Sequence, residues 1–416
     1  MPNQNTSAPR QICEQRRRFL KWLAASPLAV VPMTSFSAPY LVEGQSAADV
    51  ASRLFDQMIT SPDQALSLFD FERVASMNLP PAHFGYLASA TDDGNMRTVN
   101  RAAFDKFDLR MTRLHGQGRP DLSVELFGEQ FDAPFFICPV SSLRAFHPEG
   151  ELAMARAARA TNIPMSISTF SSTGIEQVNQ AYRQPVWFQL YLQSQFEAST
   201  ELVQRAEQSG SKVLLFTVDS PARSTSSVGA LYERLDTRDC TACHNDFIGQ
   251  RWHKPMVAPL SSNGMPEQTG PFLDWSIIDR LRNITDMKIV VKGIETQADA
   301  EAARSVGVDA VYVSNHGGRV MHSGRAALNC LPEVVAGAGQ LPVLIDSGFR
   351  RGSDVFKALA LGATAVGFGR PFIWGMAAFG QEGAEKAVDM VMRELRTSMI
   401  HAGAGKVQDI HAGMLS

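Results

Sequence analysis

Residues 288–314 read KIVVKGIETQADAEAARSVGVDAVYVS, and this stretch decides the fold. A short apolar run, Lys288–Lys292, leads into Thr296–Val306, where apolar residues recur at helical spacing, and a second apolar run follows at Ala310–Ser314. Apolar runs that are continuous rather than alternating are typical of parallel strands buried on both faces. The stretch therefore predicts a strand, a helix and a second, parallel strand.

The same unit recurs on both sides of this stretch. Further helical stretches are found at Gly150–Ala160, Ala198–Gln208 and Ser353–Leu361. Eight such units predict an α/β protein with the (β/α)8 TIM barrel fold. A doubly wound open sheet is the alternative, but no Gly-x-Gly-x-x-Gly follows the first strand. The eight expected strands are Ala133–Val140, Ile163–Ser168, Val186–Leu192, Val213–Asp219, Lys288–Lys292, Ala310–Ser314, Pro342–Asp346 and Thr364–Gly369.

The composition is that of a globular protein, with 416 residues, 44% of them hydrophobic and 19% charged. A formal charge of -3 gives no electrostatic reason to expect nucleic acid as a partner. The expected organisation is an N-terminal helical segment over residues 45–115, followed by the barrel over 116–416 with an insertion around 222–275. A final amphipathic helix is expected at Ala384–Met399.

The N-terminus carries the three parts of an export signal. Arg16-Arg17-Arg18-Phe19-Leu20-Lys21 precedes the apolar stretch Trp22–Met33 and the small residues of Ser35–Ala38. The order of the basic part resembles a twin-arginine signal, which exports proteins already folded around a cofactor. We expect residues 1–37 to be a signal peptide and the periplasm to be the destination; an uncleaved amphipathic anchor is the alternative.

The cysteines beyond the signal fall into two groups. Cys138 and Cys330 have apolar neighbours and are expected to be inert core residues. Cys240-Thr241-Ala242-Cys243-His244 matches the attachment signature of haem c, which is credible in an exported protein. A disulfide, a redox pair, or a metal site with His244 or His253 are the alternatives.

Polar residues gather where the expected strands end, and in this barrel the active site lies at those ends. The last two loops, Asp346–Gly352 and Gly367–Pro371, combine glycines with arginines and predict a phosphate site. His316, between Asn315 and Gly317, is a candidate general base. The remaining candidates are Asp219 to stabilise its imidazolium, Arg319 to grip a carboxylate, and Lys292 either to face the cavity or to form a structural ion pair.

Two segments are specific enough to identify a family. Residues 313–319 read VSNHGGR and residues 345–363 read IDSGFRRGSDVFKALALGA. With YLAS at 86–89, HPEGE at 147–151, FQLY at 188–191 and TVDSP at 217–221, the chain resembles the FMN-dependent 2-hydroxy-acid dehydrogenases and oxidases. That family includes glycolate oxidase, lactate dehydrogenase and mandelate dehydrogenase. The resemblance covers about residues 70–401.

The resemblance implies a role for each matching position. His316 would remove the hydroxyl or alpha proton of the substrate, with Asp219 behind it, and Lys292 would face the flavin N1/C2 carbonyl. The substrate's carboxylate and hydroxyl would be bound by Tyr86, Tyr191 and Arg319. The isoalloxazine and ribityl parts of FMN would be surrounded by Pro139, Val140, Ser141, Ser168, Gln189 and Thr217, with Ser314 beside the cofactor. The ribityl chain and phosphate would be held by Asp346, Gly348, Arg350, Gly369 and Arg370.

One departure from the family pattern concerns the substrate. Ser226 stands where the family usually has a second substrate arginine, so either Arg223 or Arg234 reaches in instead, or the substrate differs from a small 2-hydroxy acid. The leading hypothesis is FMN-dependent oxidation of an L-lactate-like 2-hydroxy acid, with electrons passed to a quinone or cytochrome. The alternatives are an exported FMN redox relay carrying a haem or metal at Cys240, Cys243 and His244, and a barrel that binds a ligand without oxidising it. By resemblance, a homo-oligomer is expected.

Overall fold

Eight parallel strands form one sheet, in the order β3-β10-β9-β8-β7-β6-β5-β4. This computed structural model describes residues 58–116, 118–220, 224–238, 254–260 and 274–416. A bridge between Ile137 and Met165 joins β3 to the residue before β4 and closes the circle. The predicted (β/α)8 barrel is therefore confirmed. Its strands are β3 (Phe135–Ile137), β4 (Ser166–Ser168), β5 (Trp187–Leu190), β6 (Val213–Thr217), β7 (Lys288–Ile294), β8 (Ala310–Val313), β9 (Val343–Ile345) and β10 (Ala365–Phe368).

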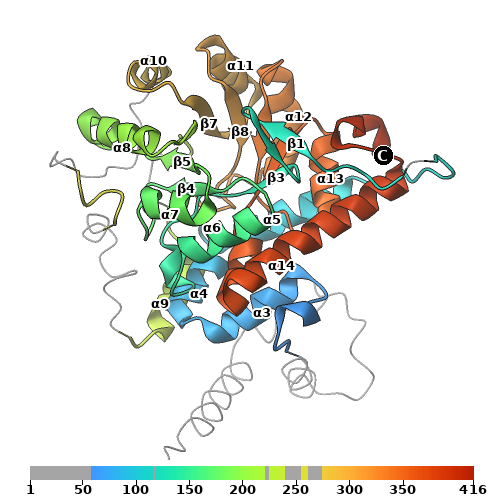
Figure 1. The fold of residues 1–416 in the computed structure, drawn as a ribbon, viewed down its shortest axis with the longest axis horizontal. Helices are drawn as coiled ribbons and strands as arrows, with labels where there is room; N and C mark the ends of the chain where they lie inside the picture. The colour runs from blue at the N-terminus through green and yellow to red at the C-terminus, as the bar shows by residue number, and fades with distance from the viewer. Residues whose placement is uncertain (1–57, 117, 221–223, 239–253, 261–273) are drawn as a thin grey trace, which may run out of the picture. The chain divides into compact units, whose positions relative to one another are not determined.

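A helix follows each strand, and in Figure 1 these helices lie around the strands. They are α6 (Glu151–Ala160), α7 (Ile175–Tyr182), α8 (Phe196–Gln208), α10 (Ile277–Arg282), α11 (Gln297–Ser305), α12 (Ala327–Ala338), α13 (Gly352–Ala360) and α14 (Arg370–Ala402). The helix predicted at Ala384–Met399 lies within α14, which is kinked at Phe379 and Gly380. An additional helix, α9 (Ser227–Leu235), lies between β6 and α10.

Helices also precede the barrel. They are α3 (Leu68–Asn78), α4 (Pro81–Ala88) and α5 (Met96–Ala102), followed by the 3-10 turn η4 (Ala103–Lys106). α3 packs on α14, where the rings of Phe71 and Phe379 meet edge to face at 6.2 Å. The end of α4 and the whole of α5 approach the carboxyl ends of the barrel strands, as the contacts below show.

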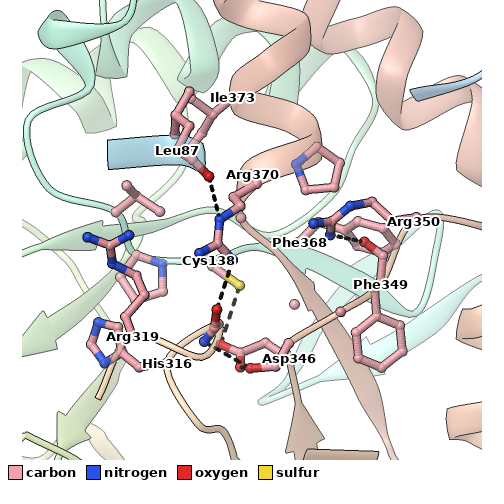
Figure 2. A pocket seen from close by; sticks show the side chains of 18 of the residues that line it. Leu87, Cys138, His316, Arg319, Asp346, Phe349, Arg350, Phe368, Arg370 and Ile373 are labelled. Atoms are coloured by element: carbon pink, nitrogen blue, oxygen red, sulfur yellow. Dashed lines mark hydrogen bonds between the residues drawn. The ribbon is translucent and has the colours of Figure 1, made fainter. Parts of the chain in front are cut away.

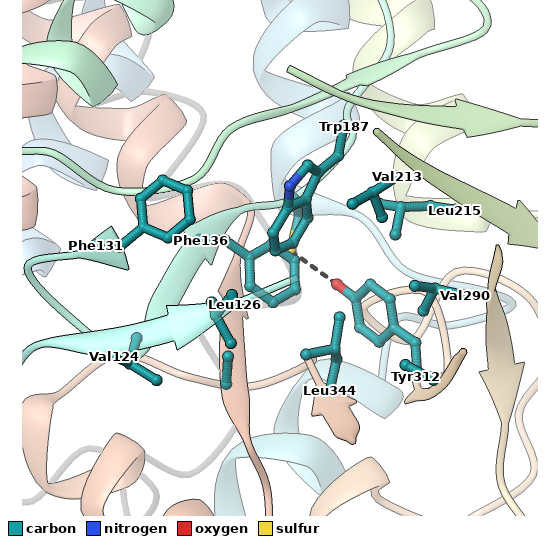
Figure 3. Close-up of a cluster of buried hydrophobic side chains, with 13 residues drawn as sticks. Val124, Leu126, Phe131, Phe136, Trp187, Val213, Leu215, Val290, Tyr312 and Leu344 are labelled. Atoms are coloured by element: carbon teal, nitrogen blue, oxygen red, sulfur yellow. Dashed lines mark hydrogen bonds between the residues drawn. The ribbon is translucent and has the colours of Figure 1, made fainter. Parts of the chain in front are cut away.

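The barrel interior is filled by large apolar side chains, as a closed barrel of this size requires. Phe136, Leu215 and Leu344 are fully buried there, and the hairpin of β1 (Val124–Leu126) and β2 (Glu129–Phe131) packs against the same cluster (Figure 3). One interior side chain, Tyr312 of β8, carries a hydroxyl, which lies 3.3 Å from the Cys138 sulfur. The core therefore contains a polar group directly beneath the strand ends.

Several predictions fall on residues that the structure leaves undescribed. These include the signal peptide of residues 1–37, Arg223, and the Cys240, Cys243 and His244 motif. Within the described ranges, no helix is long and apolar enough to cross a membrane, and no cluster of His, Cys, Asp and Glu could hold a metal ion. The division of the chain into a signal, a helical segment and a barrel with an insertion stays a prediction.

Candidate active site

A cavity that is partly open to solvent lies at the carboxyl ends of the strands. In the view of Figure 2, His316 and Arg319 lie on one side of it and Arg350 on the other, with Arg370 and Asp346 between them. The cavity thus brings together most of the residues predicted to bind the substrate and the cofactor. The predicted residues that line it are Tyr86, Pro139, Val140, Lys292, His316, Arg319, Asp346, Gly348, Arg350, Gly369 and Arg370.

Other predicted residues stand behind the cavity wall. Ser168 donates a hydrogen bond to Gln189 Oε1 over 3.1 Å, and Gln189 Nε2 donates to Thr217 Oγ1 over 3.0 Å. This chain links the ends of β4, β5 and β6 beside the cavity. Ser314 is fully buried, and Ser141 is half-buried after β3. The structure therefore places these five side chains around the strand ends without placing them on the cavity surface.

His316 is held by hydrogen bonds at both ring nitrogens. Nδ1 lies 2.9 Å from Asp219 Oδ1, and Nε2 lies 3.2 Å from the Tyr191 hydroxyl. Because an ionised carboxylate only accepts hydrogen bonds, a neutral imidazole donates from Nδ1, and its Nε2 is then the acceptor that faces the Tyr191 hydroxyl. The backbone of His316 is left-handed, with φ at 57°, and its N–H donates to Ser314 Oγ over 2.9 Å.

Asp219 and Lys292 form a buried ion pair, with Nζ and Oδ2 2.7 Å apart. Burial alone would raise the pKa of Asp219, but its interactions with His316 and Lys292 outweigh this effect and hold the pKa well below its usual range. Burial would lower the pKa of Lys292, but Asp219 and Asp346 raise it overall. Lys292 therefore both lines the cavity and forms an ion pair with Asp219, as the two alternative predictions for this residue had it.

Arg319 is anchored through one nitrogen. Its Nη1 donates to Tyr86 O over 2.8 Å and to Ser89 O and Oγ over 3.3 and 3.2 Å, while its guanidinium stacks on the Tyr86 ring at 4.0 Å. Nε and Nη2 make no hydrogen bond within the described part of the chain. These two donors form a fork suited to a carboxylate.

Arg350, which is buried, and Arg370, which is half-buried, are the cations of the predicted phosphate site. Arg370 donates to the carbonyls of Leu87, Gly317 and Ser89 over 2.9, 2.9 and 2.7 Å, and Arg350 donates to its neighbour Phe349 O over 2.7 Å. Burial lowers the pKa of Arg350 to about 10 and moves the pKa of Arg370 well below its usual value. Neither forms an ion pair with a described carboxylate. Such cations favour an anionic ligand.

Asp346 accepts hydrogen bonds from three protein hydroxyls. Oδ1 accepts from Ser314 and Ser347, each over 2.7 Å, and Oδ2 accepts from Tyr312 over 2.8 Å. Cys138 lies 3.8 Å from the same Oδ2. Cys138 and Cys330 are buried free thiols, and burial raises the pKa of both.

Sequence reasoning missed several side chains that hold the site. Tyr312 could have been noticed as the hydroxyl in an otherwise apolar run, whereas Ser89 carries no local signal. Ser226 stands at the position where the family usually has a second substrate arginine. It caps the N-terminus of α9 and accepts a hydrogen bond from Gly229 N over 3.1 Å. Arg234 is exposed on the same helix, so no described arginine from this region enters the cavity.

Comparison with known proteins extends the sequence match. A model of the FMN-dependent dehydrogenase family matches residues 75–416. A peroxisomal (S)-2-hydroxyacid oxidase of Arabidopsis thaliana is 35% identical over 353 residues, covering 84% of this chain and 95% of the relative. L-lactate oxidase of Nostoc sp. is 34% identical over 367 residues, covering 86% and 100%. A crystal structure of mandelate oxidase superposes with a TM-score of 0.74 at 33% identity, covering 85% and 98%.

Proposed function

This chain belongs to the FMN-dependent dehydrogenase family and is an FMN-dependent 2-hydroxy-acid oxidoreductase, and we propose that it oxidises an L-lactate-like 2-hydroxy acid to the 2-oxo acid with His316 as the base. The observation that carries the proposal is the pairing of His316 with the buried Asp219 on the same side of the cavity as the Arg319 fork. Oxidation of a 2-hydroxy acid needs a base that takes a proton from the substrate and a cation that binds the substrate's carboxylate.

The phosphate end of the cavity suits the phosphate of FMN. Arg350 is buried and Arg370 is half-buried, neither has a carboxylate partner among the described residues, and Gly348, with a φ of 92°, lines the same cavity. A glycine there lets backbone N–H groups approach an anion closely. We assign the phosphate to these residues together with Gly369, the ribityl chain to Asp346, and the flavin edge to Lys292. When bound, FMN supplies the acceptor for the two electrons that leave the substrate.

His316 takes the proton. The hydrogen bond from Nδ1 to Asp219 leaves Nε2 as the acceptor on the side of the Tyr191 hydroxyl, and a substrate hydroxyl bound beside that of Tyr191 would give its proton to Nε2. The imidazolium formed would lie 2.9 Å from a carboxylate that stays ionised because Lys292 also pairs with it. Asp219 would thus stabilise the charge on His316 without itself taking the proton.

Arg319 and the two tyrosines orient the substrate. The free Nε and Nη2 of Arg319 would bind the substrate carboxylate, and Tyr86, stacked under the guanidinium, would form the adjacent wall. Tyr191 stacks on His316 with ring centroids 6.4 Å apart, so its hydroxyl lies at the reacting side of the imidazole. Together these groups would hold the hydroxyl of the substrate beside His316 Nε2.

We further propose that the mature protein acts in the periplasm and passes electrons to a quinone or cytochrome. The support is the twin-arginine-type sequence of residues 16–21. The test is the reoxidation of the reduced enzyme by a soluble quinone, by cytochrome c and by oxygen, compared under one set of conditions. Fast reoxidation by oxygen with hydrogen peroxide release would contradict this acceptor.

The Cys240, Cys243 and His244 motif lies outside the described residues and remains a sequence-based hypothesis for haem c. A purified exported protein that lacks a Soret band and carries no added mass on this peptide would eliminate haem.

A substrate panel tests the main proposal. Under anaerobic conditions, 2-hydroxy acids with side chains from hydrogen to phenyl are added to the FMN-loaded protein, and loss of the flavin absorbance is followed. The proposal expects at least one L-2-hydroxy acid to bleach the flavin, and its 2-oxo acid to appear in equal amount. If no member of the panel bleaches the flavin, the oxidation proposed here is wrong.

A further inference from the structure

The short helix α5 contacts the loop that carries His316 through a buried pair of side-chain amides. Asn100 is 2% exposed, and its Nδ2 donates to Asn315 Oδ1 over 2.9 Å while Asn315 Nδ2 donates back to Asn100 Oδ1 over 2.8 Å. Asn315 directly precedes His316. A reciprocal amide pair satisfies a donor and an acceptor on each side and therefore fixes both position and orientation.

The same amides close the loop around His316. Asn315 Oδ1 also accepts from Gly318 N over 3.0 Å, and Asn100 Oδ1 also accepts from Ala327 N, at the start of α12, over 3.2 Å. His316 has a left-handed backbone, and such a conformation at a residue other than glycine persists only where the surrounding structure enforces it. The Asn100 and Asn315 pair supplies this constraint from outside the barrel.

The next residue of α5, Arg101, contacts the loop Asp346–Gly352, to which we assign phosphate binding and which we call the phosphate loop. Arg101 Nη1 donates to Gly348 O over 3.2 Å, and its guanidinium forms two hydrogen bonds with the carboxylate of Asp354, which is buried. Asp354 in turn accepts from the backbone N–H groups of Arg350 and Arg351 over 2.8 and 2.9 Å. Arg101 therefore balances the charge of the carboxylate that shapes this loop.

α5 also packs too closely on both loops to shift independently of them. A Cβ at Gly318 would lie 2.8 Å from the Cβ of Met96, and one at Gly348 would lie 2.6 Å from Asn100 O. Both glycines have positive φ, at 79° and 92°. Movement of the helix would thus be transmitted to the His316 loop and to the phosphate loop.

We propose that α5 is a positioning element for both ends of the active site. Asn100 sets the placement of His316 through Asn315, and Arg101 sets the phosphate-binding loop through Gly348 and Asp354. This inference rests on the proposed role of His316. It assigns a functional contribution to two consecutive residues that belong to no barrel strand and do not line the cavity.

A double-mutant cycle tests the first half. Asn100→Ala and Asn315→Ala are each expected to lower kcat about 100-fold, because a displacement of about 1 Å at a reacting group has an effect of that size. KM and the Kd of FMN, measured by flavin fluorescence, are expected to change little. Because Asn100 acts through Asn315, the double variant should be no slower than the slower single variant. Asn100→Asp keeps the volume and serves if the alanine variant does not fold.

Arg101→Met tests the second half by FMN titration of the apoprotein. Loss of the charge-assisted bonds is expected to raise the Kd of FMN about 10-fold, and kcat at saturating FMN should fall less than in the Asn100 variants. Lys106→Met is the matched control. Lys106 is an exposed residue of the adjoining turn whose Nζ lies 3.4 Å from Asn329 Oδ1, and its removal should leave both quantities unchanged.

The outcomes separate this inference from the proposed function. If the wild-type protein oxidises a 2-hydroxy acid and loses that activity in His316→Ala, but Asn100→Ala and Asn100→Asp keep the wild-type kcat, the positioning role is wrong. Additive losses in the double variant would also overturn it. If the wild-type protein is inactive, or His316→Ala is fully active, the proposed function itself fails.

Discussion

Replacing Asp219 by Asn gives the sharpest test of the catalytic group. The change keeps the shape of a side chain that is 6% exposed and removes its charge. Two neighbours lose their negatively charged partner at once, His316 Nδ1 at 2.9 Å and Lys292 Nζ at 2.7 Å. The first loss concerns catalysis, and the second concerns stability.

The structure gives a magnitude for each loss. A hydrogen bond to a charged group contributes up to about 3 kcal/mol, so loss of the bond to the imidazolium should lower kcat about 100-fold. Removing one partner of a buried ion pair costs about 3–5 kcal/mol of folding stability, because the other charge stays buried alone. Asp219→Asn should therefore be both slower and less stable than the wild type.

A second substitution separates the two effects. In Asp219→Asn with Lys292→Met, the unpaired buried cation is gone, so the melting temperature should recover while kcat remains low. The assays are anaerobic flavin reduction for catalysis and thermal unfolding followed by circular dichroism for stability. A kcat near the wild-type value in Asp219→Asn would refute the assignment of Asp219, even if the protein were destabilised.

Three further changes probe the phosphate end, the substrate end and the half-buried carboxyl group of Glu295. Arg350→Met should raise the Kd of FMN about 10-fold or more through loss of a charged contact to phosphate, and leave the Kd of riboflavin unchanged in the same titration; an equal effect on both flavins would argue against that contact. Ser89→Ala removes one support of Arg319 and should raise KM about 2- to 10-fold with little change in kcat; an unchanged KM would show that the support is dispensable. Burial raises the pKa of Glu295 to about 7 from 4.5, so the folded protein retains a proton that the unfolded chain releases, and stability is lost as pH rises through that interval. The melting temperature of Glu295→Gln should therefore rise relative to that of the wild type between about pH 5 and about pH 8, and a constant difference would contradict the raised pKa of Glu295.

The barrel could be predicted because its strands are buried on both faces and read as continuous apolar runs. The run Ala310–Ser314 became β8, and Lys288–Lys292 became β7, which continues two residues further across an irregularity after Lys292. Other expected strands were longer than the observed ones. In the first, Pro139 and Val140 lie beyond the end of β3 and line the cavity, as residues at the carboxyl ends of the strands do in such barrels.

The candidate site was predictable only where local sequence carries the chemistry. His316 and Arg319 stand in a short glycine-rich segment, and their chemistry follows from residue type and position. Asn100 carries no such signal, because its partner Asn315 is 215 residues away in the chain. Tyr312 is buried in a strand, and its contribution follows from the approach of Asp346 on the neighbouring strand. Contacts between segments that are distant in the sequence can be identified only from the folded structure.

The central claim is that His316 accepts the substrate proton, and one rapid-mixing experiment tests it most directly. Wild-type protein and His316→Gln, loaded with equal FMN, are mixed without oxygen with the best 2-hydroxy acid of the panel. The account predicts that flavin reduction in the variant is slower by at least about 100-fold, with substrate binding retained. Flavin reduction at the wild-type rate in His316→Gln would contradict it.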